Sequence, residues 1–136
     1  MKINGYEIKP GVNLSGCDLS NQELDYCNLQ GANLENAILT GCSLKGTNLK
    51  YSKLQGADLS NSNLEEADLT GCNLKYANLT NCNLIKCKMF NIEVYQTIFN
   101  EPSNILNNEK LDNLQQEIEE LKKYKKFYEE FKSKMP

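Results

Sequence analysis

The sequence predicts an all-β solenoid, a chain that coils repeatedly through short extended segments, followed by a C-terminal α-helix. Three observations lead to this fold class. Leucine recurs at every fifth residue through most of the chain, a column of small residues runs two positions ahead of it, and the C-terminal segment instead has apolar residues at helical spacing. With 136 residues, the chain can bury one continuous core but is too short for a second unit of enzyme size.

The leucine column is unbroken from Leu14 to Leu84 and continues through Met89, Val94 and Phe99. Five residues advance a helix by about 500°, which would wind the leucines around its axis. On a flat strand they would alternate between the two faces. An extended piece followed by a corner satisfies the period, because it returns each leucine to the same interior. The predicted core lining includes Leu34, Leu39, Leu59, Leu64 and Leu79.

The column of small residues contains every alanine and all six cysteines of the chain. We expect Cys42, Cys72 and Cys82 to line the core beside the leucines, because a thiol packs as a compact hydrophobe. The sequence lacks the tight Cys-x-x-Cys pair that is typical of a metal site. We therefore expect all six cysteines to be reduced, inert core thiols, and we expect neither a metal nor another cofactor.

Several stretches of the repeat match one consensus. They read GANL at 31–34, GADLS at 56–60, EADLT at 66–70 and YANLT at 76–80. On these A(D/N)LXX strings the chain resembles the pentapeptide repeat proteins. The resemblance implies a right-handed, four-sided (quadrilateral) β-helix with four pentapeptides in each coil. Residues 10–101 would then form about four and a half coils and a rod on the order of 22 Å tall.

Columns at a spacing of twenty residues support the four-sided coil independently. Tyr51 lies between Gly31 and Gly71 in such a column, and Gly56 lies beneath Tyr76, so glycine is expected to leave room beside bulky corner residues. An exterior column also alternates in charge, as stacked neighbours should. Its members are Asp25, Lys45 and Glu65.

Residues 1–9 are expected to form a small hairpin that caps the first coil, because Asn4-Gly5 is a turn sequence between apolar flanks. Pro10 then begins the repeat. Gln22 is large for an inward position near this cap, where it can reach free backbone groups. The sequence leaves its role open.

Residues 102–136 are expected to form a linker and an amphipathic helix from about Asn108 to Lys134. The apolar residues of the helix follow a 3-4-3-3-4-3 spacing, which departs from a strict heptad and favours a packed helix pair or a helix on the last coil. The last coil itself has apolar residues at phases that point outward, including Ile98. The sequence leaves open whether the helix dimerises or folds back. The predicted dimer or cap interface is Ile85, Phe90, Tyr95, Leu111, Leu114, Ile118, Leu121, Tyr124, Tyr128 and Phe131.

Composition excludes several classes of function. The chain has no histidine, arginine or tryptophan, which removes histidine bases, histidine metal ligands and arginine-based reading of nucleic acid. Its formal charge of −3 makes a polyanion a poor partner. No apolar run is long enough for a membrane span, and the first residues lack a secretory signal, so we expect a cytoplasmic protein that binds neither membrane nor nucleic acid.

We expect no enzyme, because acidic clusters such as Glu65, Glu66 and Asp68 lie on flat sides with no predicted cleft. The favoured function is a non-catalytic structural or protein-interaction module, a rigid rod that forms a homodimer through its C-terminal helix and binds an unknown protein. The hydroxyl column leaves an adhesin or ice-binding template as a lesser alternative. That column is Ser20, Thr40, Ser60 and Thr80.

The resemblance implies another alternative. Some pentapeptide repeat proteins bind DNA gyrase as DNA mimics, protect it from quinolones and dimerise through C-terminal helices. Residues 10–100 carry nine acids against six lysines, a net charge of −3. A duplex of about 22 Å would carry about thirteen negative charges, so the charge of this chain departs from that pattern.

Overall fold

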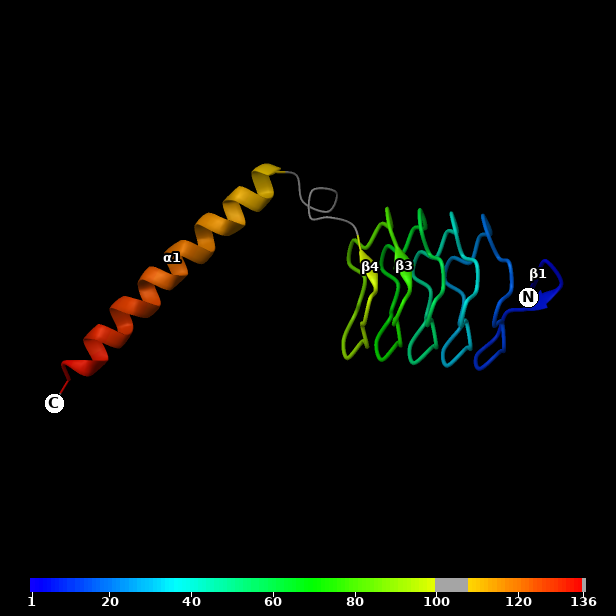
Figure 1. Cartoon of the computed structure of the whole chain (residues 1–136), viewed down its shortest axis with the longest axis horizontal. Helices are drawn as coiled ribbons and strands as arrows, with labels where there is room; N and C mark the ends of the chain where they lie inside the picture. The colour runs from blue at the N-terminus through cyan, green and yellow to red at the C-terminus, as the bar shows by residue number, and fades with distance from the viewer. Residues whose placement is uncertain (100–107, 136) are drawn as a thin grey trace. The chain divides into compact units, whose positions relative to one another are not determined.

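The computed structural model describes residues 1–99 and 108–135, and side chains of the helix from residue 112 onward. The chain divides into two compact units, Met1–Asn100 and Glu101–Pro136. The first unit is a stack of coils made of very short extended pieces, and the second contains a single described helix (Figure 1).

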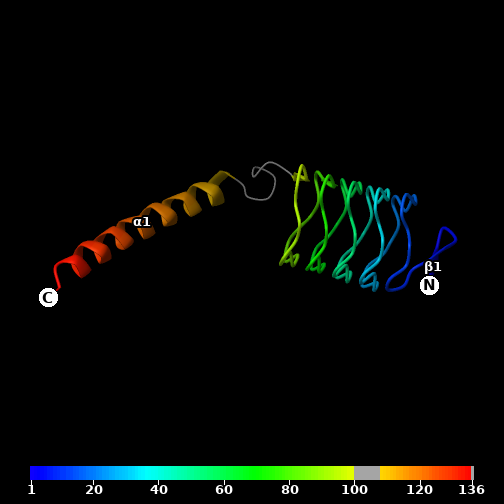
Figure 2. The ribbon, with the colours of Figure 1, turned by 60° about the horizontal axis from the view of Figure 1, so that its bottom comes forward.

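Parallel pairing in the first unit always joins residues twenty positions apart. Isolated bridges follow this register from Asn13 with Asn33 to Asn73 with Glu93. Only at the last of these steps is the pairing long enough to count as strands, where β3 (Asn78–Leu79) pairs with β4 (Ile98–Phe99). The bridges fall into four columns, which is the register expected from the resemblance, and successive coils lie side by side in Figure 2.

Every corner of the coil has the same backbone conformation. Each fifth residue from Gly11 to Gln96 has a positive φ, between 47° and 71°. At a representative corner the N–H of Ala57 donates to the carbonyl oxygen of Leu54 at 3.0 Å, so that Gly56 is the third residue of a four-residue turn. A positive φ at this position favours glycine and asparagine, the two residues that occur most often in this column.

The polar backbone of one pentapeptide, Ala57–Asn61, shows why the consensus contains Asp or Asn. All five of its N–H groups donate a hydrogen bond at 2.8–3.0 Å. Four of these bonds go to backbone oxygens, but the N–H of Ser60 has only the Oδ1 atom of Asp58 as its acceptor. In order, the acceptors are the carbonyl oxygens of Leu54, Ala37 and Asn78, the Asp58 carboxylate and the carbonyl oxygen of Thr80.

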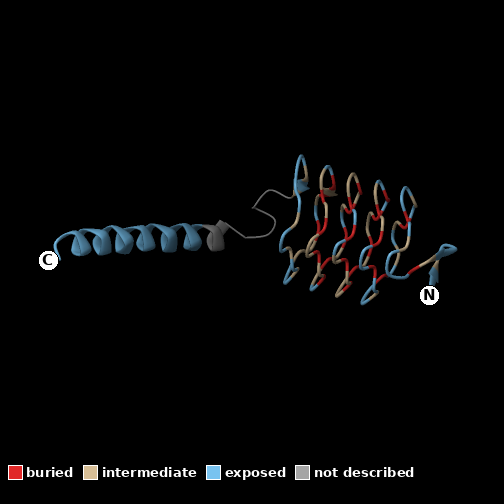
Figure 3. Ribbon diagram, turned by 90° about the horizontal axis from the view of Figure 1, so that it is seen from below, coloured by how far each residue is buried: buried red, intermediate tan, exposed pale blue. Residues whose placement is uncertain are grey.

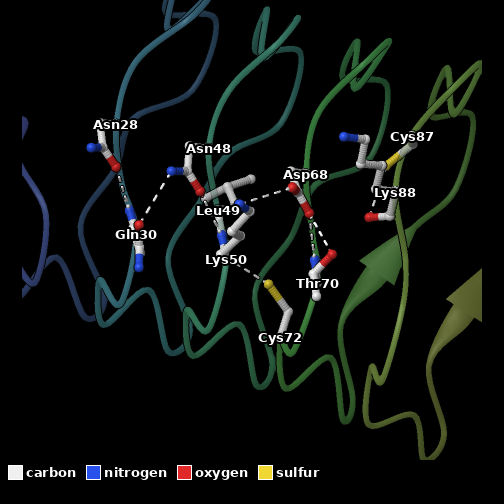
Figure 4. Close-up of polar contacts among 10 residues, drawn as sticks. All are labelled: Asn28, Gln30, Asn48, Leu49, Lys50, Asp68, Thr70, Cys72, Cys87 and Lys88. Atoms are coloured by element: carbon white, nitrogen blue, oxygen red, sulfur yellow. Dashed lines mark hydrogen bonds and ion pairs between the residues drawn. The ribbon is translucent and has the colours of Figure 1, made fainter.

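This side-chain bond recurs along the array. Figure 4 shows it on one side of the coil, where Asn28, Asn48 and Asp68 each accept the N–H two residues later at 3.0–3.1 Å. Hydrogen bonds from Ser60, side chain and backbone, lower the pKa of Asp58 despite its partial burial. The hydroxyls of Ser60 and Thr80, which belong to the exterior hydroxyl column, donate to Asp58 and Asn78 within their own coils, at 2.6 Å each.

The core is a column of fully buried leucines with a column of small residues beside it. Leucines from Leu14 to Leu79 have at most 1% of their surface exposed. Figure 3 shows the buried residues concentrated inside the middle coils, with exposure increasing toward the ends of the array. Polar members of the small column are also satisfied, since the buried Thr47 hydroxyl donates to the Leu24 carbonyl oxygen at 2.8 Å.

The expected glycine neighbours of bulky corner residues are only partly correct. A Cβ added to Gly71 would lie 2.4 Å from the Tyr51 ring, whereas one added to Gly31 would meet nothing within 4 Å. Corner side chains therefore lean toward the following coil and not the preceding one. The expectation that Gly56 leaves room for Tyr76 is wrong, because Gly56 faces the side chain of Asn36.

At the N-terminus, β1 (Lys2–Ile3) pairs antiparallel with β2 (Tyr6–Glu7) around the Asn4-Gly5 turn. Ile8, which follows this hairpin, is buried in the core cluster, and Ile3 packs against the cluster. Gln22 is half-buried, and its Nε2 donates to the carbonyl oxygen of Ser20 at 3.2 Å.

The second unit contains helix α1 (Asn108–Ser133), which ends with Lys132 in its last turn. Every side chain described along it is exposed. Within the described ranges, no helix is long and apolar enough to cross a membrane.

Candidate functional site

The residues predicted to line the core lie inside the coils. Each of them has no more than 6% of its surface exposed. They are Leu34, Leu39, Leu59, Leu64, Leu79, Cys42, Cys72 and Cys82. These positions hold the rod together and leave function to the outer surfaces and the ends.

The six cysteines are all free, but they are not all inside. Cys42, Cys72 and Cys82 are buried, whereas Cys17, Cys27 and Cys87 are only half-buried, which corrects the expectation that all six are core thiols. Cys17 and Cys27 belong to the first coil and Cys87 to the last coil that the structure describes, so each lacks a covering coil on one side among the described residues. Among the described residues, no group of ligands could hold a metal ion.

The buried thiols are hydrogen-bonded as well as packed. The Sγ atoms of Cys42, Cys72 and Cys82 donate to carbonyl oxygens of leucines at 2.8–2.9 Å. Burial raises the pKa of all three thiols, and it raises the pKa of Cys87 to about 12. Because the thiolate is the reactive form, these groups are poor nucleophiles near neutral pH.

Some of the charges on the sides of the rod are paired across neighbouring coils. Lys45 lies 3.6 Å from Glu65, which raises the pKa of Lys45. Two further ion pairs join Lys50 with Asp68 at 3.6 Å, drawn in Figure 4, and Lys75 with Glu93 at 3.0 Å. All of these pairs are exposed or half-exposed, so they contribute little to stability, but they neutralise acids that would otherwise form a negative surface.

The C-terminal end of the rod is apolar. We call this surface the apolar end and define it as Ile85, Phe90, Val94, Tyr95 and Ile98. Between 51% and 66% of the surface of each of these side chains is exposed. The Tyr95 ring packs edge-on against the Tyr76 ring, with their centroids 5.5 Å apart.

Val94 is the member of the apolar end that the sequence analysis missed. It belongs to the leucine column and was expected to point inward with the rest of that column. Within the described residues no coil follows it, so the end of the core opens here. The only sequence signal was the loss of leucine itself, which gives way to Met89, Val94 and Phe99.

Helix α1 carries a second uncovered apolar surface, which we call the stripe. Its members with described side chains are 43–71% exposed. They are Leu114, Ile118, Leu121, Tyr124, Tyr128 and Phe131. The predicted stripe also includes Leu111, whose side chain lies outside the described residues. Phe127 is 68% exposed and was missed, although it lies three residues after Tyr124 and four residues before Phe131, and it widens the apolar surface beside the stripe.

Comparisons with known proteins agree with the repeat. The family model described as pentapeptide repeats matches eight copies, over residues 11–41, 27–65 and 52–91. No curated protein matches the chain.

Two solved structures are similar over most of the rod. Rfr23, a pentapeptide repeat protein of the cyanobacterium Cyanothece 51142, is 34% identical with a TM-score of 0.66, and the match covers 66% of this chain and 62% of that one. A pentapeptide repeat protein of the Arabidopsis thaliana thylakoid lumen is 35% identical with a TM-score of 0.62, covering 64% of this chain and 61% of that one. This chain thus spans about three-fifths of the length of either relative.

A third solved structure is QnrB1, a plasmid-mediated fluoroquinolone resistance protein, at 16% identity and a TM-score of 0.37. That match covers 61% of this chain and 60% of QnrB1, and a likeness this low carries no functional argument. Pentapeptide repeat proteins form right-handed β-helices and generally serve as structural or interaction scaffolds. The repeated corner, the twenty-residue register and the matched repeats together establish that this chain belongs to the pentapeptide repeat family.

Proposed function

We propose that the chain is a non-catalytic protein-interaction module with two parts. Residues 10–101 form a four-sided, right-handed β-helix of about four and a half coils, which acts as a rigid rod. The C-terminal helix joins two copies into a homodimer, and residues 1–9 cap the first coil. Six free cysteines suit a reducing compartment, which is why we place the module in the cytoplasm.

The rod is suited to presenting side chains at fixed positions. Bridges at a constant twenty-residue register hold each outer residue above its counterpart in the preceding coil, at about 4.8 Å spacing. The sides are polar, and their charges are mixed in sign and partly paired, so a protein partner would be recognised by shape and hydrogen bonds. The partner protein itself is unknown.

The observation that carries the proposed dimer is the uncovered stripe of α1. A helix in a protein gains most of its stability by packing its apolar face against another element, and an isolated helix is only marginally stable in water. Helix α1 instead leaves six large apolar side chains of the stripe between 43% and 71% exposed. Uncovered apolar side chains that follow one another along a helix are typical of an interaction surface, and a second copy presents an identical stripe.

Replacing Leu121 with glutamate is expected to weaken the dimer by about 100-fold or more, because the symmetric contact would bury two unpaired charges. The matched control is Gln116→Glu, which adds the same charge on the opposite side of the helix. Light scattering measures the masses, with a monomer of 15.4 kDa. We expect the unaltered chain and Gln116→Glu to have twice that mass at tens of micromolar. A monomeric unaltered chain, or a Leu121→Glu variant that stays dimeric, would contradict the proposal.

The charge distribution weighs against the alternative of a DNA mimic that protects gyrase. Three of the nine acids in the rod, Glu65, Asp68 and Glu93, lie in ion pairs with lysines. A mimic must present an almost continuous line of negative charge, about one per 1.7 Å of its length. The rod presents scattered acids interrupted by lysines, so we favour a protein partner that does not normally bind DNA.

A further inference from the structure

The spacing of the stripe reads the same in both directions. From Leu111 to Phe131 the intervals are 3, 4, 3, 3, 4 and 3 residues, with Leu121 at the centre. The position seven residues before Leu121 is Leu114, and the position seven residues after it is Tyr128. Ile118 and Tyr124 lie three residues to either side in the same way. The seven residues of the stripe are therefore symmetric about the middle of α1. Phe127, which lies beside the stripe, has no apolar counterpart, because its mirror position is Gln115.

This symmetry distinguishes the two ways of pairing identical helices. In a parallel pair each residue lies level with its own copy, so any spacing is matched and symmetry about the centre has no role. In an antiparallel pair with its two-fold axis at Leu121, each residue lies level with the one equally far on the other side. Only a stripe that is symmetric about its centre then places apolar residues against apolar residues all along the contact.

The charges of α1 change sign at the same centre, so that one half of the helix is acidic and the other half is mainly basic. Residues 112–121 carry four acids and no lysine, whereas residues 122–135 carry six lysines and two glutamates. The sign changes at the centre of the stripe, between Glu120 and Lys122. A parallel pair would bring acid beside acid and lysine beside lysine. An antiparallel pair brings the acidic half of each helix beside the basic half of the other.

Stabilisation of a lone helix does not account for this pattern. The helix dipole favours acids in the first turn and bases in the last turn, and its influence ends within those turns. Here the sign changes in the middle of the helix, and Glu129 and Glu130 lie near the C-terminus, where the dipole disfavours acids. Local pairing explains one contact, the ion pair of 3.2 Å between Glu119 and Lys122, but not the concentration of four lysines in residues 122–126.

We propose that α1 pairs with α1 of a second copy of this chain in an antiparallel arrangement, with the two-fold axis at Leu121. The inference rests on the proposed dimer and adds its orientation. Tyr128 of one copy lies level with Leu114 of the other, and Tyr124 with Ile118. The apolar residues of the stripe are closer together on average than the 3.5 residues of a heptad repeat, so the apolar surface winds around α1. The two helices therefore cross at Leu121 and do not form a long coiled coil.

The test uses the full chain with two new cysteines, Leu114→Cys and Tyr128→Cys, under mild oxidation. The two positions are about 21 Å apart along one helix, too far to form a disulfide within a chain. Digestion after lysine separates them into the peptides 111–122 and 127–132, which contain none of the natural cysteines. Mass spectrometry then identifies which peptide is linked to which. The unaltered chain, oxidised in the same way, shows what the natural cysteines contribute.

The antiparallel pair predicts a dimer linked between the two different peptides, 111–122 of one copy to 127–132 of the other. A parallel pair predicts each peptide linked to its own copy, an outcome that overturns the orientation while leaving the proposed dimer intact. The Leu121→Cys variant serves as the second measurement, since residue 121 meets its own copy in either orientation. No linked dimer in either variant, together with a monomer mass for the unaltered chain, would instead overturn the dimer itself.

Discussion

Replacing Leu59 with alanine is expected to lower the free energy of unfolding by about 2 to 5 kcal/mol, because it leaves a cavity inside the coil. Leu59 has no exposed surface, and its neighbours in the column, Leu39 and Leu79, are equally enclosed. Its carbonyl oxygen also accepts a hydrogen bond from the Cys82 thiol at 2.9 Å, which fixes the surrounding backbone. Equilibrium unfolding in urea measures the loss.

The control is Val94→Ala, which shortens a side chain in the same column. Val94 is 51% exposed at the apolar end, so its truncation is expected to cost about 1 kcal/mol or less. A loss below about 0.5 kcal/mol for Leu59→Ala would mean that the leucine column is not the core. Equal losses at the two sites would mean that the array does not end where the structure places its last coil.

Removing one complete coil is expected to be better tolerated than removing a slightly shorter segment. Deleting residues 48–67 joins Thr47 to Asp68 and preserves both the five-residue period and the twenty-residue register. Deleting residues 48–64 removes three residues fewer but leaves Leu44 and Leu69 eight residues apart. The second deletion shifts every later leucine out of phase, so the coils on its two sides can no longer share one core.

Urea unfolding distinguishes the two deletions through the slope of the transition, which scales with the surface exposed. We expect the 48–67 deletion to unfold in one transition, with a slope reduced in proportion to the surface that one coil exposes on unfolding. For the 48–64 deletion we expect the slope to fall by about half, because only one side of the junction stays cooperatively folded. Equal behaviour of the two proteins would show that phase does not matter and would contradict a continuous core.

Much of the rod could be predicted from the residues because its period is short and strict. The inward position of Leu59 follows from a spacing that suits neither a helix nor a flat strand. The same regularity did not predict the positive φ of the corner residues. Tyr51 and Glu66 have positive φ values of 59° and 60°, although neither residue favours them, because the bonds of the neighbouring coils impose the conformation on every fifth residue.

The sequence could not predict toward which neighbouring coil a corner side chain leans, or which residues are exposed where the array ends. Nothing in the glycine column indicates that Tyr51 leans toward Gly71 and away from Gly31, because a column of residues is the same in both directions. Nor does the leucine column show that Val94 is half exposed, since burial depends on the coil that follows. The stripe of α1 was predicted by its spacing, but its exposure required the structure.

The central claim is that each turn of the chain is hydrogen-bonded to the turn one coil later. Nuclear magnetic resonance can detect this directly through scalar couplings across hydrogen bonds, from an amide nitrogen to the acceptor carbonyl carbon. The structure predicts couplings nineteen residues apart, from Leu59 to Asn78 and from Leu64 to Asn83, where the N–H to oxygen contacts are 2.8 Å. Couplings to carbonyls four residues earlier, as in a helix, or at any spacing other than nineteen for these leucines, would contradict it.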